Sequence, residues 1–197
     1  AAVTCLFVLL SALSSGIRHT LIDTATTLST GHLNVGGFFK VTSSQAAPVV
    51  TEYEKVAEVV KRSLGDEMEF MVVRGRGWGK LVSDRGSMQA GIAGIDIRAE
   101  PQFKSVLEII DGNLEELAQP NTLLVFEQQA KKLDLKVGDA ITISAATTRG
   151  VANTVDVRVV ALARDVGLLS SWNVFIPSDS LRELSQLKSN VTGAIQI

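Results

Sequence analysis

The sequence predicts an α+β fold, and three observations support this. Of the 197 residues, 46% are hydrophobic and 20% are charged, which is enough apolar material for a folded core. Apolar residues recur at helical spacing through residues 17–31 and 49–65. Short apolar or alternating segments, typical of β-strands, occupy residues 122–126, 140–144 and 155–163. The chain is long enough for one large domain or two small subdomains that mix helices and strands.

The N-terminal segment carries no charge from Ala1 to Ile17. A helix that crosses a bilayer needs roughly 20 apolar residues, so we expect the end of a membrane helix in a longer protein that is cut within it. A signal-peptide core, a lipoprotein motif around Cys5 and a buried helix of a soluble protein are the alternatives. Helical spacing continues to Leu28, which predicts a stalk helix that ends at Gly31. The single cysteine excludes an internal disulfide.

The segment after the stalk predicts a strand, a loop, a helix and a second strand. Residues 32–39 alternate as a strand does, and residues 43–48 form a polar loop. Pro48 is expected to open the next helix, because proline fits the first helical position. Gly65 should end that helix, and residues 68–73 are apolar enough for a buried strand.

The stretch RGRGWGK, Arg74 to Lys80, has the glycine content of a phosphate-binding loop but not its spacing. No helix pattern follows it, and a Ser-Asp-Arg-Gly turn separates it from a second extended run, which predicts a β-hairpin. Glycines inside a strand mark bulges or close backbone approach. The side chains at even positions, Arg74, Arg76, Trp78 and Lys80, should share one face, which we expect to be solvated.

The second half of the sequence predicts a short helix or turn and a loop over residues 99–117, followed by further strands and helices. The expected strands are residues 122–126, 140–144, 155–163, 172–177 and 191–197, and the expected helices are residues 127–135 and 180–187. A polar connection is expected at 145–154, and Ser178 or Asp179 is expected to cap the last helix.

The residues that carry chemistry are few. His19 and His32 have no third ligand at metal spacing, and no nucleophile elbow or paired catalytic carboxylates are found, so we expect no metal site, no cofactor and no enzyme. The net charge of −2 and the 5% aromatic content disfavour nucleic-acid binding.

The order of these elements resembles the extracytoplasmic core domain of MacB/FtsX-type ABC transporter permeases, including the lipoprotein-releasing LolC/LolE branch. The segments that carry the resemblance are Gly31–Val35, Gly94–Asp96, Asp111–Leu114 and the block Leu124–Ile143. These motifs are structural rather than catalytic, and in this order they cover nearly the whole chain.

The resemblance implies an α+β domain in two parts after the membrane helix and stalk of residues 1–30. A porter-like part would hold residues 31–97 and 160–197, and a strand-rich, sabre-like insert would hold residues 98–159. The connection at 145–154 is shorter than the carrier-docking hairpin of one lipoprotein-releasing subunit and lacks its paired prolines. A non-docking, LolE-like role and a more general efflux role therefore both remain open.

The resemblance also implies a function in transport. The partners would be a cytoplasmic ABC ATPase that binds the ATP, a second permease subunit, the bacterial inner membrane, and a lipoprotein or periplasmic protein. ATP hydrolysis would drive release or export of a lipoprotein or hydrophobic cargo by mechanotransmission through the stalk, with this domain on the periplasmic or extracellular side. A membrane-anchored binding or scaffolding module is the first alternative, and a secreted enzyme is the second. Candidate contacts with a partner or cargo are Trp78, Arg76, Arg149, Leu168, Leu169 and Trp172.

Overall fold

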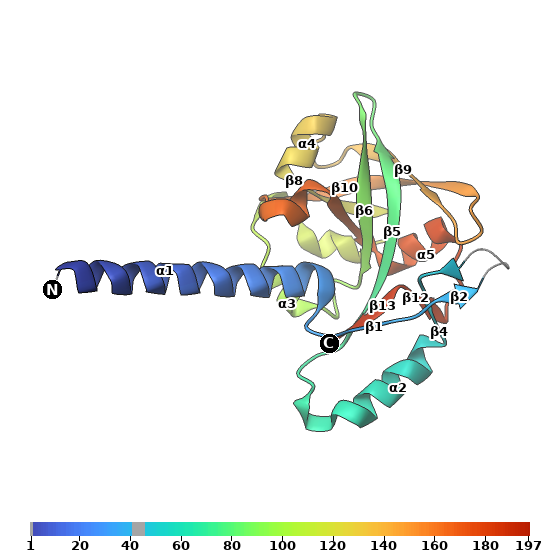
Figure 1. Cartoon of the computed structure of the whole chain (residues 1–197). Coiled ribbons are helices and arrows are strands. Elements are labelled where there is room, and N and C mark those ends of the chain that lie inside the picture. Colours follow the sequence, from blue (N-terminus) through green and yellow to red (C-terminus); the bar gives the residue numbers. More distant parts are fainter. Residues whose placement is uncertain (1, 41–45) are drawn as a thin grey trace.

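The computed structural model of the chain describes residues 2–40 and 46–197, and it mixes helices with strands as an α+β fold does (Figure 1). The helices are α1 (Ala2–Ala25), α2 (Tyr53–Leu64), α3 (Pro101–Ser105), α4 (Glu127–Leu133) and α5 (Ser178–Ser185). The short helical turns are η1 (Thr26–Thr30), η2 (Gly65–Glu67), η3 (Leu114–Ala118) and η4 (Gly167–Ser171). The strands are β1 (Asn34–Gly36), β2 (Phe39–Lys40), β3 (Ala46–Ala47), β4 (Val50–Thr51), β5 (Val72–Val82), β6 (Ser87–Ile95), β7 (Ile109–Gly112), β8 (Thr122–Phe126), β9 (Ala140–Ala146), β10 (Ala152–Ala163), β11 (Asn173–Pro177), β12 (Val191–Thr192) and β13 (Ala194–Gln196).

Six strands close into a ring in the order β5, β6, β11, β8, β10 and β9, and β9 pairs with β5 again. The pairs β6–β11 and β8–β10 are parallel, and the other four are antiparallel. Strand β5 makes the closure possible because one of its edges pairs with β6 while the other pairs first with β13 and then with β9. Strand β1 extends the sheet beyond β13, and β7 extends it beyond β10.

The two faces of the ring bury separate hydrophobic cores. In β8, Leu123 and Val125 pack inside with α5, whereas Leu124 and Phe126 pack outside with Phe175. The outer core also contains α3 and η3, and its aromatic rings meet edge to face, with Phe103 4.8 Å from Phe175 between ring centroids. This alternation follows from the two-residue period of a strand and explains why all five residues of β8 are buried.

The glycines of β5 lie on its inner face, as expected for close backbone approach. A Cβ at Gly75 would lie 2.6 Å from Leu181 of α5, so the glycine lets this helix pack against the strand. A Cβ at Gly79 would lie 2.6 Å from the Ser144 carbonyl oxygen, where β5 meets both β6 and β9. The predicted hairpin is confirmed, with its turn at Ser83–Gly86 between β5 and β6. RGRGWGK is therefore one arm of this hairpin.

Helix α1 extends away from the rest of the domain and continues into η1 (Figure 1). Gly31 ends the stalk after η1, as predicted, with a φ of 66° and its N–H bonded to the Thr26 carbonyl at 2.7 Å. Among the described residues, no helix is both long enough and apolar enough to cross a membrane. The assignment of residues 1–17 to the end of a membrane helix is not confirmed and stays a prediction.

The segment before α2 differs from the expectation. Pro48 does not open the helix, which begins at Tyr53 after Glu52. Val50 and Thr51 are β-branched and instead pair with β12, in a small sheet of two strands. Half of the predicted loop 43–48, residues 43–45, lies outside the described residues, and Ala46–Ala47 form strand β3 rather than loop because they pair with β2. Gly65 ends α2 as predicted, with its N–H bonded to the Lys61 carbonyl.

Two predicted strands have different bounds. The strand expected at 32–39 is interrupted at Gly37, where a Cβ would lie 3.0 Å from the Val49 carbonyl oxygen of a neighbouring segment. The strand expected at 68–73 begins only at Val72, because pairing with β13 begins there.

The predictions for residues 99–117 and for the connection 145–154 were also wrong in part. Part of the loop expected within residues 99–117 is strand β7, which pairs with β10 in an antiparallel ladder. Only half of the connection is turn, because β9 extends to Ala146 and pairs there with Ala152, where β10 begins.

The predicted cap of the last helix was wrong as well. Helix α5 follows β11 directly, so Pro177 occupies the N-cap and no side chain caps the helix. Ser178 is already helical, which explains why it cannot serve as the cap.

The predicted division into two parts stays a prediction. The six-strand ring draws β5, β6 and β11 from the porter-like part and β8, β9 and most of β10 from the insert. The ring is therefore the structural element that would join the two parts.

Replacing Gly79 with Ala should lower the free energy of unfolding by about 1–3 kcal/mol, because the added methyl group overpacks the meeting point of β5 and β9. Gly36→Ala is the matched control, since a Cβ there has open space, and it should change stability by less than about 1 kcal/mol. Urea denaturation of both variants measures the difference. Equal losses would contradict the assigned close approach at Gly79.

Candidate functional site at the end of the stalk helix

A groove with a volume of about 210 Å³ lies on the outer face of β5 and β6, against the end of the stalk. We call it the outer groove. Its floor contains Gly91, which has no side chain, and Ala93, whose side chain is one methyl group, and both leave space between larger neighbours. Its walls come from η1, from the outer face of β5, and from η4 with the start of β11. The wall residues are Leu28, Ser29, Arg74, Arg76, Trp78, Leu169, Trp172 and Asn173.

The stalk end is fastened to the domain by side chains and by burial. Leu28 is 3% exposed and packs in the outer core. The Ser29 carbonyl accepts two hydrogen bonds, from Arg76 at 2.5 Å and from the Gln196 amide at 2.7 Å. Because these partners come from β5 and β13, the last turn of the stalk is held by strands distant in sequence.

Arg74 lies at the centre of these contacts. Its side chain is 3% exposed and forms an ion pair with Glu100, which is equally buried. A further guanidinium nitrogen donates to the Leu28 carbonyl at 2.9 Å, and the guanidinium lies 5.5 Å from the centre of the Phe103 ring. One side chain therefore joins β5, the stalk end and the start of α3.

The solvated face predicted for β5 is correct for Arg76, Trp78 and Lys80 and wrong for Arg74. The alternation of the strand places all four side chains on one face, as expected. The stalk end and α3 cover that face near Arg74, and Glu100 compensates its charge.

Arg76 differs from Arg74 in having no carboxylate partner among the described residues. Partial burial, and secondly the positive charge of Arg74, lower the pKa of Arg76 from its ordinary value. The guanidinium stays protonated at physiological pH, because arginine titrates far above it. The groove therefore holds one uncompensated positive charge.

The other end of the groove is aromatic. Trp78 and Trp172 meet edge to face, with ring centroids 6.2 Å apart, and each is about half exposed. The Trp172 carbonyl accepts a hydrogen bond from Gly91 N–H at 2.6 Å, which fixes η4 against β6. A Cβ at Gly91 would lie 2.5 Å from the Asn173 side-chain oxygen, so the glycine makes room for this side chain.

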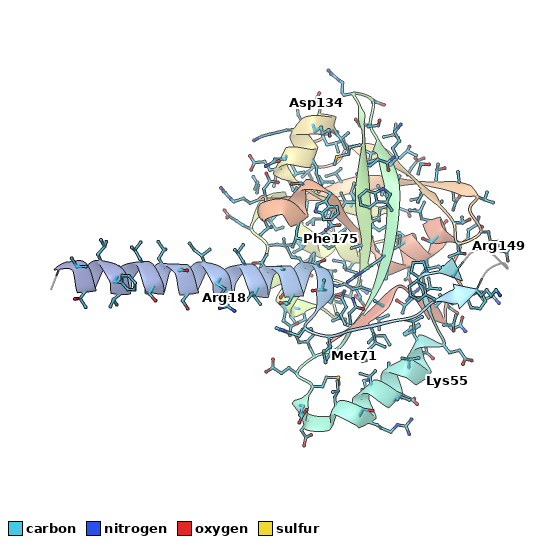
Figure 2. The ribbon with its side chains drawn as sticks, in the orientation of Figure 1. Arg18, Lys55, Met71, Asp134, Arg149 and Phe175 are labelled. Atoms are coloured by element: carbon cyan, nitrogen blue, oxygen red, sulfur yellow. The ribbon has the colours of Figure 1, made fainter. Side chains whose placement is uncertain are left out.

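The structure brings four of the six predicted contact residues to one place: Arg76, Trp78, Leu169 and Trp172 all line the outer groove. Arg149 does not join them. It lies on the far side of the domain from the stalk (Figure 2), beside a separate cavity of about 400 Å³. The side chain of Leu168 lies outside the described part of the structure, so its predicted role is untested.

Sequence reasoning missed Arg74, Glu100 and Leu28 as parts of the site. Arg74 and Glu100 are 26 positions apart and carry no motif, so only the fold brings them together. Leu28 was assigned to the apolar stripe of the stalk, and that stripe was the one available signal of its burial.

The groove has the chemistry of a binding site rather than of a catalytic centre. Its lining offers two guanidinium groups, two indole rings, an amide and the Ser29 hydroxyl, and no histidine or carboxylate lies among the lining residues to act as a base for that hydroxyl. Within the described part of the chain, no three His, Cys, Asp or Glu side chains gather as a metal site.

Models of known protein families and curated protein sequences give no match to this chain. Solved structures do. The extracellular domain of the noncanonic ABC-type transporter YknZ from Gram-positive bacteria aligns with a TM-score of 0.51 at 15% identity, over 83% of this chain and 81% of that chain. The periplasmic region of MacB from Actinobacillus actinomycetemcomitans aligns with a TM-score of 0.47 at 17% identity, over 71% of this chain and 62% of that chain.

The YknZ alignment shows that the chain shares the fold of an extracytoplasmic domain of an ABC-type transporter, and it confirms the resemblance in fold predicted from the sequence. The chain covers less than two thirds of the length of the MacB region. The lipoprotein-releasing branch has no support from these comparisons.

Replacing Glu100 with Gln should lower the free energy of unfolding by about 3–5 kcal/mol, because Arg74 would keep its charge in a buried site without a carboxylate. Glu116→Gln is the matched control. It removes a carboxylate from the exposed pair with Arg158 and should cost less than about 1 kcal/mol. Chemical denaturation monitored by circular dichroism measures both. Similar costs at the two positions would refute the assigned role of the buried pair.

Proposed function

We propose that this chain is the extracytoplasmic domain of an ABC transporter permease subunit. In this role it couples ATP hydrolysis on a cytoplasmic partner to release or export of a lipoprotein or hydrophobic cargo. The coupling is mechanical, through the stalk. The ATP binds to the partner ATPase, and this chain itself performs no enzymatic reaction and holds no cofactor.

The observation that carries the proposal is the rigid attachment of the stalk. A helix transmits displacement to a domain only where no flexible linker separates them. Here α1 continues into η1 without a break, and the buried Leu28, the Leu28 carbonyl and the Ser29 carbonyl are all bound by the domain. Movement of α1 would therefore act directly on β5 and β13.

The position of the last strand supports the same proposal. Ile197 N–H donates to the Leu33 carbonyl at 3.0 Å, and His32 N–H donates to the Ile197 carbonyl at 2.7 Å. Strands β1 and β13 lie side by side near the base of the stalk (Figure 1). Any chain that continued past Ile197 would leave the domain beside the stalk, as a domain inserted between two membrane helices requires.

The finer parts of the proposal concern partners and place. The partners are the ATPase, a second permease subunit and a lipoprotein or periplasmic protein. The domain lies on the periplasmic or extracellular side of the bacterial inner membrane. Residues 1–17 would anchor the stalk in that membrane. The tight turn between β9 and β10 supports a non-docking, LolE-like or efflux role over carrier docking.

Purification of the full-length protein from solubilised membranes of its host should recover an ABC-type ATPase in stoichiometric amount. Mass spectrometry identifies it by its Walker motifs, and a mock purification without the tagged protein is the control. Recovery of the protein alone, from membranes that contain ABC ATPases, would overturn the proposal and favour a membrane-anchored scaffolding module.

A flexible Gly-Ser-Gly-Ser insertion between Ala25 and Thr26 should abolish the transport-dependent phenotype in the host. The insertion lies before Leu28 and Ser29, so the contacts of the stalk end with the domain remain. It would break only the mechanical connection, because such sequences behave as flexible coils.

The same insertion in the exposed turn between Asp84 and Arg85 is the matched control and should be tolerated. Surface levels of both variants are compared by immunoblotting. Full transport by the Ala25–Thr26 insertion would exclude mechanical coupling through the stalk.

A further inference from the structure

The outer groove combines a positive charge with apolar walls and lacks negative charge. Among the described residues that line it, none is Asp or Glu. The charge of Arg74 is compensated by Glu100, whereas that of Arg76 is not. An anionic group placed beside Arg76 would therefore gain attraction without repulsion from a nearby carboxylate.

Arg76 can bind such a group without leaving another atom unsatisfied. In the free groove its guanidinium donates to the Ser29 carbonyl. The same carbonyl also accepts from Gln196 at 2.7 Å, so it keeps a partner when Arg76 turns to a ligand. Removing a hydrogen bond is costly mainly when a buried group is left without any partner.

The guanidinium geometry favours a carboxylate. Its planar fork offers parallel N–H donors that match the two oxygens of a carboxylate, and such charge-assisted pairs are stronger than neutral hydrogen bonds. A planar monoanion also matches the single uncompensated charge of the groove.

The rest of the groove favours an apolar body on that anion. Trp78 and Trp172 present about half of their surface to solvent, and the half-buried Leu169 adds an aliphatic wall. The small residues of the floor, Gly91 and Ala93, allow a slender chain to lie close to the backbone of β6. The volume of about 210 Å³ is below that of typical pockets for drug-sized ligands, which suits a short chain or the end of a longer one.

We propose that the outer groove binds the carboxylate end of an amphiphile of the fatty-acid class, with the carboxylate on Arg76 and the acyl chain against Trp78 and Trp172. Because Leu28 and Ser29 belong to the stalk end, the bound ligand contacts both the stalk and the sheet. Ligand binding would then weaken the hydrogen bond from Arg76 to the Ser29 carbonyl of the stalk. This effect on the stalk rests on the proposed transport function, whereas binding itself does not.

Tryptophan fluorescence tests the proposal directly, because the chain has only two tryptophans and both line the outer groove. The probe is decanoate, titrated below its micelle concentration into the purified full chain. Decanoate does not absorb at the excitation wavelength, so a saturable change in intensity or emission maximum reports the groove. Decanol is the uncharged comparison and should bind about tenfold more weakly or worse.

Arg76→Gln should weaken decanoate binding about tenfold or more, and Arg76→Lys should give a smaller loss because it keeps the charge but not the fork. Arg149→Gln is the matched control. It removes the same charge on the far side of the domain and should leave the titration unchanged. Circular dichroism verifies that each variant folds, and the lysine variant keeps the test decisive if the glutamine variant does not.

Three results would overturn the proposal: no saturable change with decanoate, equal binding of decanol, or equal losses in Arg76→Gln and Arg149→Gln. Equal binding of decanol would mean that the groove is only an apolar patch, such as a contact surface for another protein. The recovery of an ATPase with the full-length protein is measured separately. A failure of decanoate binding and a failure of the proposed transport function are therefore distinguishable.

Discussion

The buried ion pair between Arg74 and Glu100 is the interaction on which the arrangement of the stalk and the sheet depends. Both side chains are withdrawn from water, and desolvation makes such a pair costly unless further hydrogen bonds compensate it. Here the compensation comes from the Leu28 carbonyl and the Phe103 ring. The charge of Arg74 can therefore be buried only where the stalk end and α3 are both in place. This mutual dependence ties the position of the stalk to the folding of the outer core.

The closed ring of strands explains why that position is rigid. Strand β5 pairs along both edges and carries glycines inward and long side chains outward. Leu181 of α5 fills the space above the inner glycines, and the outer side chains hold the stalk. Pairing on both edges fixes the register of β5, because a shift of one residue would exchange its two faces. The contacts of Arg74 and Arg76 with the stalk are therefore fixed by the whole ring.

The sequence predicts the elements that local pattern determines and misses those that depend on distant partners. The hairpin at Ser83–Gly86, the end of the stalk at Gly31 and the block from β8 to β9 follow from turn residues and periodicity. Pro48 was wrongly predicted to open α2. Val50 instead pairs with Thr192, which is 142 positions away in the chain (192 − 50), and no local pattern indicates so distant a partner. Arg74 was expected in solvent for the same reason, since its partners Leu28 and Glu100 are 46 and 26 positions away. Four residues of the groove were predicted as contact residues, Arg76 and Trp78 from one strand and Leu169 and Trp172 from a distant segment, but their convergence required the ring.

The outer groove occupies the joint between the stalk and the ring, so force and ligand would act on the same residues. A pull on α1 loads the Ser29 carbonyl, which Arg76 and Gln196 share. A carboxylate on Arg76 would leave the Ser29 carbonyl to Gln196 of β13, while Arg74 of β5 would keep its hydrogen bond to the Leu28 carbonyl. Since β13 pairs with β5 and β1, a larger share of the load would then pass through β13 at the edge of the sheet. By linkage, a stalk position that weakens the bond from Arg76 to Ser29 would in turn favour the bound ligand.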